Sequence, residues 1–197
     1  MHQKVLGISG STVKDGNTEI LVKEALKAAE KEGVKTEFIS LADKRIEACN
    51  LQLCDDACAK GEECPIQDDA KDIVQKMVHT DAIIMGSPVY FRTVSAQLKA
   101  LMDRTRMICY PQKKLENKIG GAIAVGEGRV SGQEFTIAII HNFYLIHKMI
   151  IVGSEWYGAY AVAQKGKKGV LKDPRDLGYA QELGKRIARL VKALKEP

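Results

Sequence analysis

Long apolar runs are absent from this 197-residue sequence, and so are internal repeats and low-complexity tracts. The longest apolar stretches are fragments such as Ile119–Gly126 and Met149–Gly153, far shorter than the roughly 18 residues of a membrane-spanning helix. The first residues, Met1–Ile8, are interrupted by Gly7 too early to form a secretory signal peptide. We therefore expect a cytoplasmic protein that does not enter a membrane.

A strong excess of charge is also absent. The net charge is +5, from 30 basic and 25 acidic residues, which is too mild to indicate a nucleic-acid partner. Apolar residues make up 45% of the chain and charged residues 28%, so the chain can bury a sizeable core and disorder is excluded as its main theme.

Short apolar strands and helical patterns alternate five times along the chain. We expect strands at 4–8, 36–40, 82–87, 119–125 and 149–153, and helices near 18–31, after the capping residue Asp68, from Val94, from Gln133 and over 174–195. The strands are short apolar runs rather than alternating ones, which is typical of a parallel sheet that is buried on both faces. The sequence thus predicts one α/β domain over residues 1–197, with a doubly wound five-stranded parallel sheet, three α/β/α layers and a Cys-rich loop at 41–67.

Three loops follow the carboxyl ends of the expected strands, where ligands of such sheets bind. The first, Ser9–Thr18, does not spell GxGxxG, a Walker A loop or Gly-x-Ser-x-Gly. Its glycines allow backbone amides to turn inward, its hydroxyls can donate, and the helix that follows adds a positive dipole. This combination predicts a phosphate-binding loop; the alternative is an ordinary turn that caps a helix.

The second loop, Ser87–Thr93, carries two adjacent aromatic residues, and the third, Gly126–Gly132, is rich in glycine. Aromatic residues at the end of a buried strand favour a flat ligand, unless they pack under the next helix. Glycines allow the backbone to approach a ligand closely. A phosphate loop on the first strand and a flat-ligand loop on the third match the flavodoxin-like arrangement, which binds FMN at this point.

The first two loops, together with Ser95–Arg104 and Gly132–Glu134, resemble the NADPH-dependent FMN reductase family over nearly the whole chain. The resemblance implies non-covalent FMN in a homo-oligomer, either a dimer or a tetramer. Arg92 departs from the family, which usually has a small residue there. With the loop residues Gly16 and Ser87 added, the expected cofactor-binding residues are Ser9, Ser11, Thr12, Gly16, Asn17 and Thr18 at the phosphate, Ser87, Pro88, Val89, Tyr90 and Phe91 at the isoalloxazine ring, and Gly126, Glu127 and Gly128 nearby.

Four of the five cysteines fall within sixteen residues, at Cys49, Cys54, Cys58 and Cys64. In a reducing compartment such a cluster favours a metal site over disulfides, and both iron–sulfur clusters and zinc use four thiolates. A subgroup of the family, the iron–sulfur flavoproteins, carries a compact cysteine motif after its second strand. The gaps here are wider by three residues, although the flanking residues fit the family pattern. Cys109 stands alone and is interpreted as a small buried residue.

The second strand of a flavodoxin-like sheet lies beside the first, so the cysteine loop is expected at the same sheet edge as FMN. This position favours a [4Fe-4S] cluster over zinc or empty thiols. We expect an FMN-dependent oxidoreductase that passes electrons between the cluster, FMN and a redox partner such as ferredoxin or NAD(P)H. No catalytic side chain is named, because the flavin performs the chemistry.

Two other functions fit the same residues. One is an NAD(P)H-dependent FMN or quinone reductase without a cluster, and the other is a zinc-stabilised binding module. The apolar run Phe135–His147 predicts a helix that is buried on more than one side and partly faces another subunit. Within it, His141 and His147 are interpreted as packing residues.

Overall fold

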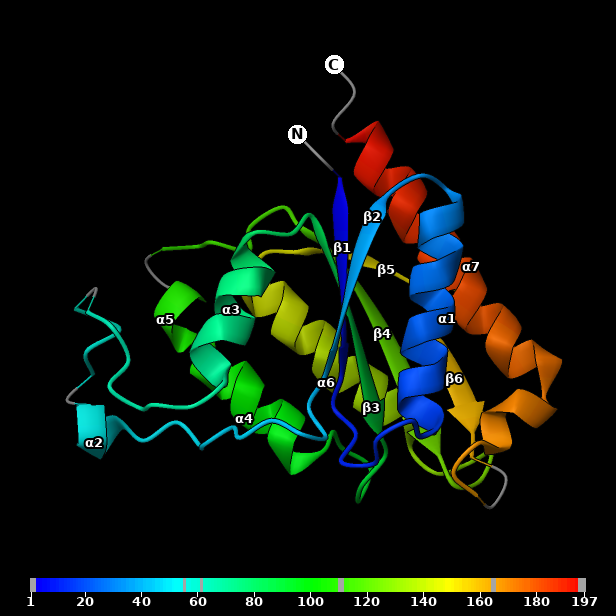
Figure 1. Ribbon diagram of the computed structural model, residues 1–197, viewed down its shortest axis with the longest axis horizontal. Helices are drawn as coiled ribbons and strands as arrows, with labels where there is room; N and C mark the ends of the chain where they lie inside the picture. The colour runs from blue at the N-terminus through cyan, green and yellow to red at the C-terminus, as the bar shows by residue number, and fades with distance from the viewer. Residues whose placement is uncertain (1–2, 55, 61, 110–111, 164–165, 195–197) are drawn as a thin grey trace.

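The computed structural model describes residues 3–54, 56–60, 62–109, 112–163 and 166–194. A parallel sheet lies at its centre, with strands in the order β2-β1-β3-β4-β5 and with β6 also paired to β4 (Figure 1). This architecture confirms the predicted flavodoxin-like α/β fold. The strands are β1 Lys4–Ser9, β2 Lys35–Ser40, β3 Ala82–Pro88, β4 Ile119–Gly126, β5 Ile150–Val152 and β6 Ala159–Val162.

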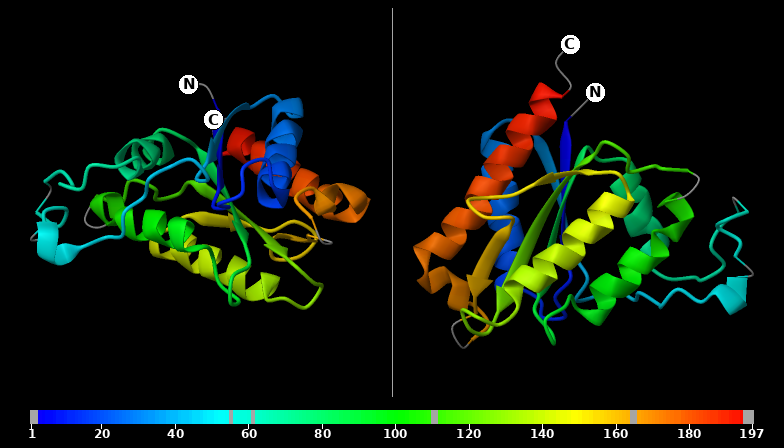
Figure 2. Two further views of the ribbon diagram at one scale, coloured as in Figure 1. Left: turned by 60° about the horizontal axis from the view of Figure 1, so that its bottom comes forward. Right: turned by 180° about the vertical axis from the view of Figure 1, so that it is seen from behind.

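Helices cover both faces of the sheet. Helices α1 and α7 pack on one face, and α3, α4 and α6 pack on the other (Figures 1 and 2). The sequence predicts that the last helix ends at 195, a position that lies outside the described residues. The helices are α1 Asn17–Lys31, α2 Leu51–Cys54, α3 Ala70–Val78, α4 Ala96–Arg104, α5 Arg106–Cys109, α6 Gln133–Ile146 and α7 Pro174–Ala193, with a 3₁₀ turn, η1, at Gly169–Lys172.

The central strands are apolar throughout because successive residues enter two different cores. In β3, Ile84 packs toward α1 and α7, whereas Ile83 and Met85 pack toward α3, α4 and α6. Gly120 of β4 lies directly under the ring of Tyr144, where an added Cβ would be 2.6 Å from Cδ2. A side chain at this position would push α6 away from the sheet.

The outer edge of the sheet corrects one sequence prediction. A single fifth strand is expected at 149–153, but two short strands share this position. Strand β5 pairs with Ile119–Gly121, and β6 pairs with Ile123–Gly126. The residues between the two strands turn tightly at Gly153, where an added Cβ would lie 2.4 Å from the Trp156 carbonyl oxygen. A strand of four residues after such a turn leaves too short a pattern to be recognised.

The cysteine-rich segment between β2 and α3 stands away from the sheet (Figures 1 and 2). Its two ends are held together: the Asp69 N–H donates to the Arg45 carbonyl at 3.0 Å, and the Arg45 N–H donates to Asp69 Oδ2 at 2.8 Å. The Glu47 N–H donates to Asp68 Oδ2 at 2.7 Å. We call these four residues the neck of the cysteine loop. Of the helices in the described ranges, none has the length and apolarity to cross a bilayer.

Candidate functional site

The loop between β1 and α1 folds around its own polar groups. The Val13 N–H donates to Ser11 Oγ at 3.0 Å, and the Gly16 N–H donates to the Val13 carbonyl at 3.2 Å. Helix α1 then begins at Asn17, and its N-cap residue, Gly16, has no side chain to occupy the free N–H groups of the first turn. The N-terminus of α1 therefore keeps its positive end available for an anion.

Ser95 ties the first loop to the second. Its hydroxyl donates to the Gly10 carbonyl at 2.5 Å and accepts the Leu98 N–H at 3.2 Å, so it also caps α4. Its own N–H donates to Ser87 Oγ at 3.0 Å. The Val89 N–H in turn donates to the Val125 carbonyl at 2.9 Å, which joins the second loop to β4. The three loops are thereby fixed relative to one another.

These loops enclose a cavity of about 380 Å³, which we call the flavin cavity. Many of the expected FMN residues line it together, although they come from three separate segments. The residues from the sequence prediction that line it are Ser11, Gly16, Asn17, Thr18, Pro88, Val89, Tyr90, Gly126 and Glu127. The N-terminal residues of α1 and the second loop thus line one space, which fits the expected FMN.

The other expected FMN residues do not line the cavity. Ser9 and Ser87 are buried at their strand ends, and Thr12 is exposed. The Gly128 N–H donates to Ser131 Oγ at 2.8 Å. Asn17 lines the cavity, but its side chain already donates to the Gly166 carbonyl at 2.8 Å and accepts the Val170 N–H at 3.1 Å.

Two groups at this site lie beyond the sequence prediction. Lys167 lines the flavin cavity and supplies an exposed positive charge. Glu19, in the first turn of α1, is almost fully buried and accepts the Asp15 N–H at 3.0 Å, a bond from Lys23 at 3.2 Å and one from the Ser40 hydroxyl. Glu19 therefore holds the phosphate loop against the end of β2. An acidic side chain on a helix is typical of the face exposed to solvent. The sequence pattern therefore does not reveal this role of Glu19.

The tip of the second loop is a tight turn. Tyr90 and Thr93 exchange two backbone hydrogen bonds of 3.0 Å, and both central residues, Phe91 and Arg92, have positive φ. The Phe91 side chain is fully exposed, whereas the Arg92 guanidinium lies over the Phe135 ring, 5.4 Å from its centroid. Arg92 thus turns toward α6.

The four clustered cysteines line one small cavity, which we call the cysteine cavity. Burial raises the pKa of the Cys49 thiol, and the nearby sulfurs of Cys58, Cys54 and Cys64 raise it further. The cavity lies at the end of α4 that carries Arg104. Helix α4 starts at the flavin edge and has nine residues, about 13 Å at about 1.5 Å per residue. The cysteine loop begins at the predicted sheet edge, because it follows the carboxyl end of β2. Its cysteines, however, lie at the end of α4 that is far from this edge.

The donor set of the cysteine cavity is the one that iron–sulfur clusters use, since four cysteines of one loop line it. In the described ranges, no three His, Cys, Asp or Glu side chains are arranged as they stand to hold a metal ion. The cavity measures about 10 Å³, room for about one water molecule. Insertion of a cluster therefore requires the loop to spread around it.

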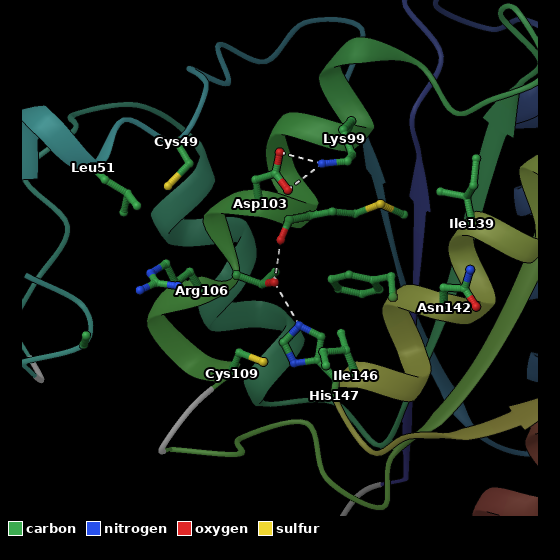
Figure 3. Close-up of a pocket in the computed structure, with 14 residues that line it drawn as sticks. Cys49, Leu51, Lys99, Asp103, Arg106, Cys109, Ile139, Asn142, Ile146 and His147 are labelled. Carbon is green, nitrogen blue, oxygen red and sulfur yellow. Dashed lines mark hydrogen bonds and ion pairs between the residues drawn. The ribbon is translucent and has the colours of Figure 1, made fainter. Parts of the chain in front are cut away.

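A larger cavity of about 770 Å³ adjoins the cysteine cavity, and Cys49 and Arg106 line both. Figure 3 shows its walls: Leu51 on the cysteine loop, Lys99 and Asp103 on α4, and Ile139 and Asn142 on α6. Cys109 also lines it and is only partly buried, in contrast to its predicted burial.

His147 is buried at the edge of this larger cavity. Its Nε2 lies 2.9 Å from the Thr105 hydroxyl, which donates to the Met102 carbonyl at 2.6 Å (Figure 3). Thr105 has one hydroxyl proton, so Nε2 carries the imidazole proton. Burial lowers the pKa of His147 to about 4.

A parallel sheet in this order, with a cavity between the loops that follow β1, β3 and β4 at its carboxyl edge, is the arrangement of a flavodoxin-like flavoprotein. The sequence of residues 3–163 matches the model of the NADPH-dependent FMN reductase family, and the chain belongs to that family. It is an FMN-binding flavin oxidoreductase.

Archaeal relatives cover almost the whole chain. An iron–sulfur flavoprotein of Methanocaldococcus jannaschii is 50% identical over 98% of this chain and 100% of its own length. Another, of Archaeoglobus fulgidus, is 35% identical over 96% of this chain and 98% of its own. Among solved structures, the WrbA-like flavodoxin of Agrobacterium tumefaciens has a TM-score of 0.70 at 17% identity, covering 99% of this chain and 100% of that one, which supports the fold alone.

Proposed function

We propose that this oxidoreductase is an iron–sulfur flavoprotein, which passes electrons between a [4Fe-4S] cluster, FMN and a redox partner such as ferredoxin or NAD(P)H. The observation that carries the proposal is that one small cavity is lined by Cys49, Cys54, Cys58 and Cys64. The names of the archaeal relatives support it. Zinc would also accept four thiolates, but it would supply no electron to a flavin.

The flavin cavity assigns roles to residues of this chain. The phosphate would lie at the N-terminus of α1, with Ser11, Thr18 and Lys167, where backbone N–H groups and the helix dipole favour an anion. The ring would lie against Pro88, Tyr90 and the backbone at Gly126. When bound, FMN can accept a hydride and release single electrons, and the protein supplies binding and orientation.

The protein should be purified without oxygen and reconstituted with iron and sulfide. We expect FMN together with about four iron and four sulfide per chain, and a broad visible absorbance that dithionite bleaches. Cys64→Ala should lose iron and keep FMN, because Cys64 lies outside the flavin cavity. Cys109→Ala is the matched control, since Cys109 does not line the cysteine cavity.

Two outcomes would replace the proposal. Full FMN occupancy without iron after reconstitution would favour an NAD(P)H-dependent FMN or quinone reductase without a cluster. Zinc in the cysteine cavity would assign that loop a structural role.

A further inference from the structure

Arg104, the last residue of α4, carries a buried charge that FMN binding does not explain. Its side chain is 1% exposed and that of its partner Asp68 is 0% exposed, with Nη1 and Oδ2 2.6 Å apart. Buried ion pairs add little net stability, because removing both charges from water offsets much of their attraction. The position of this pair therefore points to a role other than stability alone.

The guanidinium joins the cysteine cavity to the neck of the loop. Nη2 donates to Cys64 Sγ at 3.4 Å and to the Ile66 carbonyl at 3.4 Å, while Nη1 donates to the Glu47 carbonyl at 3.2 Å. Asp68 accepts the N–H of Glu47 at 2.7 Å and that of Ala70 at 3.0 Å. Arg104 lines the cysteine cavity and Asp68 does not.

We propose that Arg104 is a positioning residue that raises the reduction potential of the cluster held by the four cysteines, and that Asp68 fixes it in place and moderates its charge. This inference rests on the proposed function. An added electron makes a cluster more negative, so a nearby cation and a hydrogen bond to a ligating sulfur stabilise the reduced form. Both effects are strong where water is excluded.

The two partners predict opposite shifts. Arg104→Gln removes the cation beside Cys64, so the reduction potential should fall. Asp68→Asn keeps the size of the side chain but leaves the Arg104 charge uncompensated, so the potential should rise. If the pair only held the loop closed, both variants would lose iron together and show no such opposition of sign.

Arg106 provides a matched control. It also lines the cysteine cavity, but it and its partner Asp56 are 46% and 42% exposed, with Nη2 and Oδ1 2.9 Å apart. Water screens a charge at such a site. Arg106→Gln should therefore shift the potential much less than Arg104→Gln.

The wild type, these three variants and Arg104→Lys should be reconstituted anaerobically and titrated with reductant under electron paramagnetic resonance. We expect Arg104→Gln to lower, and Asp68→Asn to raise, the equilibrium constant of one-electron reduction by about tenfold, which is about 59 mV. Arg104→Lys keeps the charge but cannot span Asp68, Glu47 and Ile66, so it should keep most of the potential with a lower unfolding temperature of the metal-free chain.

Shifts of one sign in Arg104→Gln and Asp68→Asn, or an equal shift in Arg106→Gln, would overturn the inference. If Arg104→Gln holds no iron, the shift in reduction potential of Asp68→Asn is compared with that of Arg106→Gln. The inference is overturned unless the shift of Asp68→Asn is positive and larger than that of Arg106→Gln. Iron and sulfide in the wild type test the proposed function separately: without them both proposals fail, and with them only the potentials bear on Arg104.

Discussion

Lys167 supplies a positive charge to the end of the flavin cavity where the phosphate is proposed. We predict that Lys167→Ala weakens FMN binding about twofold to fivefold, because an exposed charge contributes about 1 kcal/mol at most. Titration of the metal-free chain with FMN, followed by flavin fluorescence, measures this at low and at high salt. Lys168→Ala is the control, because Lys168 is exposed and does not line the cavity; equal weakening in both variants would contradict the assignment.

His147 should make the stability of the fold depend on pH. Burial lowers its pKa from 6.5 to about 4, so the folded chain favours the neutral imidazole. In the unfolded chain, His147 binds a proton below its ordinary pKa of 6.5. The contribution of His147 to stability is therefore complete above pH 6.5 and is lost as pH falls from 6.5 toward 4.

Urea unfolding at about pH 7 and about pH 5 tests this, since the ordinary histidine pKa lies between these values. We predict that the wild type loses more stability between the two than His147→Gln does. Burial also lowers the pKa of His141, which remains in both proteins and cancels in the comparison. Equal losses would show that His147 is accessible to protons when folded.

Asp68 and Glu19 have roles that the sequence pattern could not reveal. The pattern suggests Asp68 as a helix cap, and its carboxylate does accept the Ala70 N–H, although Asp69 occupies the capping position. The stronger partner, Arg104, lies 36 residues away in the chain. Local patterns report neighbours along a helix or strand, so a pair formed by folding leaves no mark in them.

At the level of the elements, α1 and α7 approach each other very closely at one glycine. A Cβ at Gly184 would lie 1.9 Å from the Ala25 carbonyl oxygen, whereas a Cβ at Gly178 on the same helix meets open space. We predict that Gly184→Ala lowers the free energy of unfolding by about 2–4 kcal/mol, because the two helices must separate.

Gly178→Ala should act in the opposite direction. Alanine stabilises a helix interior by about 1 kcal/mol relative to glycine, and no neighbour opposes the added methyl group. Denaturant unfolding of both variants measures the difference. A gain in both variants would indicate that α1 and α7 lie farther apart than described.

The sheet and its main helices were predictable because each has a long, regular pattern. The three central strands, β1, β3 and β4, are runs of mostly buried residues, and α1 and α7 have apolar faces at helical spacing. The loops at the sheet edge were predicted as a set for the same reason, since parallel strands end together. In contrast, β6 has four residues and α2 has four, which is too short for a period to emerge. The direction in which the cysteine loop leaves the sheet is set by Arg104, Asp68 and the neck.

At the level of the whole molecule, α6 presents apolar side chains to the outside. Phe135, Leu145 and Ile146 are exposed, whereas Ile137, Ile140 and Phe143 are buried against the sheet. We propose that this exposed face joins copies of the chain in a homo-oligomer, because such residues gain stability when water is removed.

We predict that Ile146→Glu reduces the molar mass in solution, measured by light scattering at micromolar concentration, without unfolding the chain. Leu194→Glu, directly after α7, is the control, because Leu194 is also exposed but follows a helix on the opposite face of the sheet. A monomeric wild type, or an unchanged mass in Ile146→Glu, would contradict the assignment of this face.

The closed neck of the cysteine loop has an evolutionary consequence. Because Arg45, Glu47, Asp68 and Asp69 fix its ends, we expect changes of length between the cysteines to leave the sheet in place. A doubling of loop length adds only about 0.6 kcal/mol of closure entropy, so insertions between the cysteines are inexpensive. We therefore expect the cysteine spacing to vary between related chains while the flavin cavity stays constant. An engineer who exchanges this segment between related scaffolds would have to move Arg104 and Arg106 with it, because both contact the loop from outside the neck.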